Sequence, residues 1–135
     1  MNDLEMPPQL AARPQYQGVP VPYVTVWGKE GLPVFAESDV SRKRRCIENR
    51  LCTLCGRQLA EEIAFVGNAS QLETRLFPEP GMHEDCARFG LRTCPFLLQH
   101  SPMFLCITTD YIRHPIESEL VVKISEPVRT ERFDG

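Results

Sequence analysis

Apolar and polar residues alternate in several short stretches of this chain, and a period of two predicts β-strands. The first such stretch is 23–27, and a glycine turn separates it from a short return strand expected at 33–36. A second hairpin is expected from strands at 62–66 and 72–77, with its bend at Gly67.

Two other segments carry the signals of amphipathic helices. Ser38 and Asp39 form an N-cap pair, because a short polar side chain accepts a hydrogen bond from a free backbone N–H in the first turn, and the helix is expected over 40–50. A second helix is expected over 82–93, where acidic residues in the first turn complement the helix dipole and Pro95 prevents continuation. Strands and helices that follow one another in this way predict a small α+β fold.

The length of the chain sets its domain organisation. With 135 residues it suffices for one modest domain. Two more alternating stretches predict strands at 103–109 and 119–124. We therefore expect a flexible or extended N-terminal arm at 1–18, a single α+β domain at 19–126 and a peripheral tail at 127–135.

Two pairs of metal-binding residue types stand on either side of the second expected hairpin. Cys52 and Cys55 form a Cys-x-x-Cys turn that ends in a glycine, and His83 and Cys86 form a His-x-x-Cys pair at the start of the second helix. Two such pairs suit a tetrahedral Zn²⁺, which takes thiolate and imidazole ligands. Turn, hairpin and helix in this order predict a treble-clef-like site with one structural zinc.

The other cysteines leave one alternative open. An iron–sulfur cluster needs a fourth thiolate, for which Cys94 could replace His83. Cys94 is otherwise expected to be buried or to lie just outside the ligands. Cys46 and Cys106 are expected in the core as small hydrophobic residues. A thioredoxin-like redox pair is disfavoured because Cys52 follows a charged segment rather than a buried strand.

The ligand count argues against catalysis at this metal. Catalytic zinc sites usually keep one of four positions for water, whereas four protein ligands fill the sphere. A nuclease of the HNH type also needs a general-base histidine on the hairpin, and residues 57–80 contain none. His100 and His114 fall outside the motif. We therefore expect that the protein is not an enzyme.

Positive charge is concentrated in one segment. The net charge is −3, but residues 42–57 carry a local excess of positive charge. A basic patch next to a zinc motif is typical of phosphate binding, although charge runs are more often solvated helix faces. No aromatic residue lies at 37–64, so the patch lacks groups that stack on bases. The candidate partner-binding or nucleic-acid-binding residues are Arg42, Lys43, Arg44, Arg45 and Arg50.

Composition and hydropathy limit the setting in which the chain works. Hydrophobic residues make up 42% and charged residues 24%, as in ordinary globular proteins. No apolar run approaches the roughly 20 residues that span a bilayer. Six cysteines without a signal-peptide pattern at the N-terminus favour a reducing compartment, so we expect a cytoplasmic protein without membrane contact.

An ordered series of short motifs resembles a family of small uncharacterised proteins from bacterial and phage genomes. The motifs are Pro20-Val-Pro-Tyr23, Leu51-Cys-Thr-Leu-Cys-Gly56, Ala64-Phe-Val-Gly67, His83-x-x-Cys86-Ala87 and Cys94-Pro-Phe-Leu97. Tyr23 stands where the family has tryptophan, and Gly81 departs from its proline lead-in. The resemblance implies zinc binding at the same four residues. It implies no activity.

Three functions remain open at the level of the sequence. The favoured one is a protein-interaction module with a structural zinc, for example a phage-encoded modulator of a host protein. The second is a nucleic-acid-binding module that uses the basic segment. The third is a treble-clef nuclease of the HNH type whose general base the sequence does not reveal.

Overall fold

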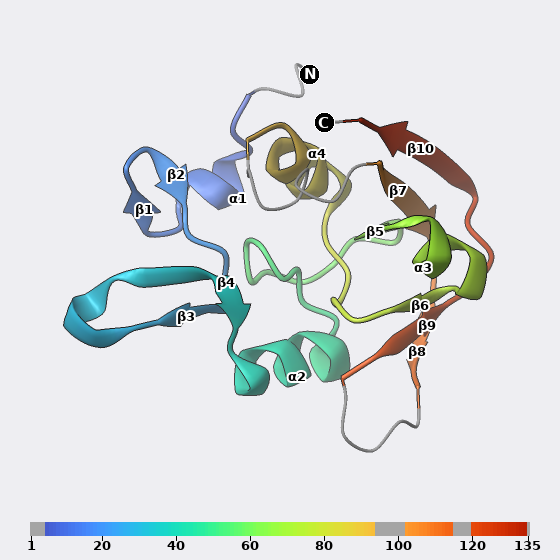
Figure 1. Cartoon of the computed structure of the whole chain (residues 1–135), viewed down its shortest axis with the longest axis horizontal. Coiled ribbons are helices and arrows are strands. Elements are labelled where there is room, and N and C mark those ends of the chain that lie inside the picture. Colours follow the sequence, from blue (N-terminus) through green and yellow to red (C-terminus); the bar gives the residue numbers. More distant parts are fainter. Residues whose placement is uncertain (1–4, 94–101, 115–119, 135) are drawn as a thin grey trace.

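The computed structural model describes residues 5–93, 102–114 and 120–134, which form a mixed arrangement of helices and small antiparallel sheets (Figure 1). The α+β fold expected from the sequence is confirmed. Its helices are α1 (Pro8–Ala11), the 3-10 turn η1 (Lys29–Gly31), α2 (Val40–Asn49), α3 (Ala69–Thr74) and α4 (Glu84–Thr93). Its strands are β1 (Gln15–Tyr16), β2 (Val19–Pro20), β3 (Thr25–Trp27), β4 (Pro33–Ser38), β5 (Ile63–Gly67), β6 (Leu76–Phe77), β7 (Met103–Thr108), β8 (Tyr111–Arg113), β9 (Val122–Ile124) and β10 (Arg129–Phe133).

The core of the molecule is organised around a three-stranded antiparallel sheet in the order β10-β7-β5. Its register places Val66 opposite Leu105 and Phe65 opposite Cys106. Since directly opposed residues share a face of a sheet, these two pairs lie on opposite faces. All five residues of β5 are buried, so both faces are covered.

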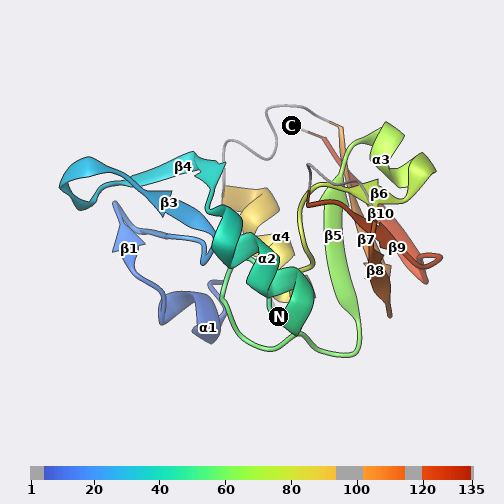
Figure 2. The same ribbon diagram turned by 90° about the horizontal axis from the view of Figure 1, so that it is seen from below.

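Different elements cover the two faces of this sheet. One face packs with α4, the N-terminal Leu10 and the segment that carries Cys52 and Cys55. The other packs with the smaller sheet β6-β9-β8 and with Ile47 of α2. In Figure 2 the β3–β4 hairpin projects from the side of the molecule opposite to these sheets.

Both long helices form where the sequence predicts them. Asp39 is the N-cap of α2, and its carboxylate accepts a hydrogen bond of 3.0 Å from the backbone N–H of Arg42. The helix ends at Arg50, which adopts a left-handed conformation with φ of 55°. Helix α4 begins two residues later than expected, with Glu84 and Asp85 in its first turn.

The predicted hairpin between the two ligand pairs is wrong. Strand β5 pairs with β7, and β6 pairs with β9, so β5 and β6 are not hydrogen-bonded to each other. The first half of the stretch predicted as the second strand belongs to helix α3, which Asn68 and Gln71 begin with a reciprocal capping box. The two capping side chains satisfy free N–H groups of the first turn, and this outweighs the weak alternation at 72–77. The site therefore lacks the hairpin of a treble clef.

Two of the expected peripheral segments contribute to the core. In the tail, β10 pairs with β7 over its whole length, and Phe133 is buried. In the arm, Pro7 and Leu10 are buried, and Leu10 packs with α4 residues. The tail is therefore not peripheral at 129–133, and the described part of the arm lies on the domain rather than free of it.

Candidate metal centre

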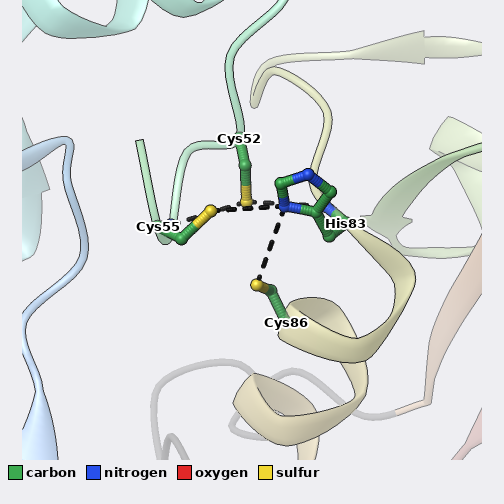
Figure 3. Close-up of side chains that lie close together, drawn as sticks. All are labelled: Cys52, Cys55, His83 and Cys86. Atoms are coloured by element: carbon green, nitrogen blue, oxygen red, sulfur yellow. Dashed lines mark hydrogen bonds between the residues drawn. The ribbon is translucent and has the colours of Figure 1, made fainter. Parts of the chain in front are cut away.

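Four side chains from two distant segments converge on one point. The ligand atoms of Cys52, Cys55, His83 and Cys86 all lie within 4.8 Å of one another, and three of the four residues are buried (Figure 3). In a tetrahedral site with metal–sulfur bonds of about 2.3 Å, ligand atoms are separated by slightly less than 4 Å. The four residues are therefore close enough to hold one metal ion, and the predicted cluster is brought together.

A tight turn positions the first pair of cysteines. The backbone N–H of Gly56 donates to the carbonyl of Cys52 at 2.8 Å, and the N–H of Cys52 donates to the carbonyl of Arg57 at 2.8 Å. Gly56 has φ of +79°, and a Cβ there would lie 2.8 Å from the ring of Tyr23. Glycine is thus required at this position for both its backbone conformation and the close contact.

A short bridge positions the second pair. Ala64 and Met82 exchange two backbone hydrogen bonds of 2.8 Å, which fix the chain immediately before His83 to strand β5. The N–H of Thr53 also donates to the carbonyl of Gly81 at 3.2 Å and joins the two ligand segments directly. These contacts replace the expected hairpin as the frame of the site.

The imidazole of His83 is oriented for metal binding. Its Nε2 lies 2.7 Å from the carbonyl oxygen of Gln58, which can only accept a hydrogen bond, so Nε2 carries the proton. The lone pair of Nδ1 then faces the sulfur atoms, at 3.2 Å from Cys55 Sγ and 3.9 Å from Cys86 Sγ. A backbone carbonyl that fixes the tautomer in this way is a common feature of metal-binding histidines.

Each sulfur atom accepts at least one hydrogen bond from an N–H group. Cys52 Sγ accepts from the backbone of Cys55 at 3.5 Å and of His83 at 3.4 Å, and Cys55 Sγ accepts from the backbone of Arg57 at 3.5 Å. Cys86 Sγ accepts from the side-chain amide of Gln9 at 3.3 Å. Donors aimed at sulfur stabilise thiolates, the form that binds metal.

The four groups alter one another's protonation. Burial alone would raise the pKa of the Cys52 thiol, but hydrogen bonds from Cys55 and Cys86 outweigh burial and lower that pKa. The hydrogen bond of the Cys86 thiol to Cys52, followed by that to Cys55, raises the pKa of Cys86. Cys55 raises the pKa of His83 in the same way. The lowered pKa favours the thiolate of Cys52, which is the form that binds a metal ion.

The donor set suits zinc among the metals that proteins use. Three thiolates and one imidazole form a common tetrahedral structural zinc set. Cys46 and Cys106 are buried and do not belong to the cluster, although Cys46 Sγ lies 3.9 Å from the carbonyl oxygen of Cys52. Burial raises the pKa of the Cys46 thiol to about 12 and that of the Cys106 thiol to about 11. Their predicted place in the core is confirmed. Cys94, the proposed fourth thiolate of an iron–sulfur cluster, and His100 lie outside the described residues.

Four of the five predicted basic residues have contacts within the protein. Arg42 and Arg45 both contact Tyr23: Arg42 lies over the ring at 5.2 Å from its centroid, and Arg45 donates to the hydroxyl at 3.0 Å. Lys43 forms an ion pair of 3.7 Å with Glu79. Arg50 pairs with Asp110 and lies over the ring of Tyr111.

Arg44 is the exception in this segment. It is exposed, and among the described residues no partner of its side chain is found. The structure therefore brings the metal cluster together, whereas the basic residues contact three different parts of the protein: Arg42 and Arg45 share Tyr23, Lys43 pairs with Glu79, and Arg50 pairs with Asp110.

Sequence reasoning missed the residues that support the cluster. Gln9 lies more than seventy positions from Cys86, yet its amide also donates to both carboxylate oxygens of Asp85 at 3.1 Å. Gln58 acts through its backbone carbonyl, which any residue could provide. No local pattern marks either role.

No protein-family model, curated protein or solved structure matches this chain. The resemblance to small bacterial and phage proteins therefore remains a prediction. Within the described residues, none of the helices has the length and apolar character needed to cross a membrane.

Proposed function

We propose that this chain is a protein-interaction module whose fold is held together by one structural zinc ion. The observation that carries the proposal is that the cluster can fill a tetrahedral coordination sphere, because four ligands converge on one point. The other ring nitrogen of His83 is hydrogen-bonded to the carbonyl of Gln58, and the sulfur atoms accept hydrogen bonds from Gln9 and from backbone N–H groups. Such a site binds its metal tightly and leaves no position for substrate or water.

The arrangement of the ligands supports a scaffolding role for the zinc. It joins the turn at Cys52, the start of α4 at Cys86 and, through Gln9, the N-terminal segment. Within the described residues, no strand pairing joins these parts to one another. A metal that connects separate segments contributes its binding free energy to folding.

A catalytic role for the metal has no support from the surrounding residues. The described part of the chain contains only His114 besides His83, and His114 follows β8, where its backbone N–H bonds to the carbonyl of Val121. A nuclease needs a base next to the metal. We propose that the zinc-loaded protein hydrolyses neither DNA nor RNA in the presence of Mg²⁺ or Mn²⁺.

The contacts of the basic segment favour a protein partner over a nucleic acid. Phosphate binding draws its affinity from free Lys and Arg side chains that displace counterions. Arg42, Lys43 and Arg50 are instead bonded to groups of the protein itself. Binding of DNA by about four cationic groups would give a slope near −3.6 of log affinity against log salt.

A capture experiment tests the proposal. Zinc-loaded protein is immobilised and exposed to lysate of the native host, next to Arg44→Glu and Cys52→Ser variants. We expect a specific protein to be retained by the wild type and by Arg44→Glu, and lost with Cys52→Ser. A salt-sensitive complex with DNA or RNA at physiological ionic strength, abolished by Arg44→Glu, would contradict the proposal and support the nucleic-acid alternative.

A further inference from the structure

A pocket of about 450 Å³ opens between the β3–β4 hairpin and helix α4. Its walls are largely apolar and come from the N-terminal segment, the β3–β4 hairpin with the residue before it, the turn after Cys52, and helix α4 with the residues before it. The apolar lining residues include Leu10, Val24, Phe35, Leu54, Met82 and Phe89. This volume lies within the range of about 300–1,000 Å³ found for ligand-binding cavities. The pocket is therefore large enough for one or two bulky side chains or for a small organic molecule.

The β3–β4 hairpin, which forms one wall of the pocket, also exposes apolar side chains. Val19 lines the pocket and is 37% exposed, and Trp27 and Leu32, at the turn end of the hairpin, are 40% and 48% exposed. Large exposed apolar groups often mark a surface that contacts a partner. Tryptophan in particular is enriched among the residues that dominate binding at protein interfaces.

The backbone beside the pocket is available for pairing. Strands β3 and β4 form a two-stranded sheet, and within the described residues neither pairs with a further strand. The register between them shifts after Thr25, so the residues of β4 that line the pocket, Phe35 to Ser38, lie in an irregular part of the pair. Edge strands of this kind accept extended peptides through backbone hydrogen bonds.

The pocket has two carboxylates at its edge. Glu37 and Glu79 both belong to its lining and are exposed. Glu79 pairs with Lys43, whereas Glu37 has no ion pair within the part of the chain that the structure describes. The edge is thus negative, and a positively charged group on a ligand would be attracted to it.

From these features we propose that the pocket binds an extended peptide segment of the partner protein, which inserts a bulky apolar side chain and places a Lys or Arg next to Glu37. This inference rests on the proposed interaction function and names the chemistry of the partner. The apolar walls would contact the bulky side chain, and the free edge of the hairpin would form hydrogen bonds with the peptide backbone. The carboxylate of Glu37 would attract the positively charged Lys or Arg. Thr53 and Leu54 lie between the zinc ligands and line the pocket, so zinc also shapes the binding site.

A random-peptide display library, selected on the zinc-loaded protein, tests the proposal. We expect selected sequences to combine a large apolar residue with a nearby Lys or Arg. Ala36→Phe places an aromatic ring at an exposed position of the pocket wall, and we expect it to weaken binding at least about tenfold without loss of zinc. Glu37→Lys should reverse the charge preference, so that selection on this variant enriches Asp or Glu.

A matched control separates the pocket from general charge effects. Glu73→Lys makes the same charge change on α3, at an exposed residue that is not part of the pocket lining, and should leave the selected sequences unchanged. The pocket proposal is wrong if no sequence is enriched, if Ala36→Phe binds the selected peptides as tightly as the wild type, or if Glu73→Lys shifts the preference as much as Glu37→Lys.

The same variants distinguish this inference from the proposed function. If Ala36→Phe retains the captured host protein as well as the wild type does, the interaction function stands and the pocket is not its site. If peptides bind the pocket as expected while the capture experiment returns only nucleic acid, the pocket inference stands and the proposed function fails.

Discussion

The two faces of the central sheet are stabilised by different means. On one face, three of the four candidate metal ligands, Cys52, Cys55 and Cys86, are themselves members of the buried cluster. On the other face, three aromatic rings meet: Phe65 lies 5.6 Å from Phe77 and 5.7 Å from Tyr111 between ring centroids. A metal ion held by these ligands would stabilise the first face, whereas the second face relies on large aromatic side chains.

The two faces differ in the kind of residue that they bury. The metal face contains large side chains such as Leu91 and Phe133, and it also contains three buried cysteines of the candidate metal centre. Aromatic residues, which dominate the other face, bury about 150–250 Å² each and gain further from their ring geometry. In a small domain a bound metal can add to the stability that such packing provides. The metal face should therefore respond to zinc and the aromatic face should not.

The largest expected effect follows from removal of a ligand. Cys52→Ser should reduce bound zinc from one ion per chain to none, and the free energy of unfolding should fall by an amount comparable to the whole stability of the domain. Structural zinc contributes on the order of 10 kcal/mol in finger peptides, and total stabilities are about 5–15 kcal/mol. Metal analysis and denaturant unfolding measure both quantities.

Cys106→Ser is the matched control for that variant. It alters an equally buried cysteine on the aromatic face and should leave one zinc per chain. Equal zinc loss in the two variants would contradict the assignment of ligands.

A smaller effect is expected from the opposite face. Phe65→Ala removes a fully buried ring that contacts both Phe77 and Tyr111 and should lower the free energy of unfolding by about 3–5 kcal/mol. Protein that remains folded should still bind one zinc, since no ligand belongs to this cluster. Loss of zinc from folded Phe65→Ala protein would show that the two faces are not independent.

Gln9 tests whether the N-terminal segment belongs to the metal face. Gln9→Ala removes the amide that donates to Cys86 Sγ and to Asp85. Loss of such an outer contact typically weakens metal binding by about 10–100-fold, and we expect a change of this size in competition with a chelator. Gln17→Ala, at an exposed residue of the same segment, serves as the control and should leave zinc affinity unchanged.

The smallest effect concerns the ion pairs that join α4 to the neighbouring strand β10. Arg129, and then Arg88, lower the pKa of Glu84 to about 2. A carboxyl whose pKa falls on folding contributes stability above its ordinary value of 4.5, and this is lost as the pH drops towards 2. Because these groups are partly solvated, we expect Glu84→Gln to cost at most about 1 kcal/mol.

The pH profile of that variant provides its check. Between pH 6 and 8 the carboxyl is fully ionised, so the difference in unfolding free energy between wild type and Glu84→Gln should be constant, and it should shrink as the pH falls from about 4.5 towards 2. Glu73→Gln, at an exposed residue with no ion pair in the described ranges, should cause no difference. A difference that changes between pH 6 and 8, or that stays constant down to pH 2, would contradict the assigned pKa.

Local signals in the sequence were sufficient for elements that depend on neighbours along the chain. The cap at Asp39 and the acidic first turn of α4 located both long helices. The spacing of Cys52, Cys55, His83 and Cys86 located the cluster, because each pair forms within one turn and needs only one long-range contact. The hairpin of β3 and β4 followed from its turn.

Features that depend on distant contacts could not be predicted. The short strand β6 pairs with β9, and β10 pairs with β7, and neither segment has a strong alternation of its own. The capping box formed by Asn68 and Gln71 is a local signal for helix α3, and the prediction of a hairpin did not take it into account. The basic segment was interpreted as a binding patch because its charges are visible in the sequence. Its contacts with Tyr23 depend on the fold and cannot be seen there.

Hydrogen exchange of the zinc-loaded protein before and after addition of a chelator tests the difference between the faces most directly. We predict one zinc per chain, and after its removal a loss of amide protection in the segments 5–12, 52–58 and 83–93, while β8 and β9 keep theirs. Unchanged protection of the metal-face segments, or an equal loss in β8 and β9, would contradict the account.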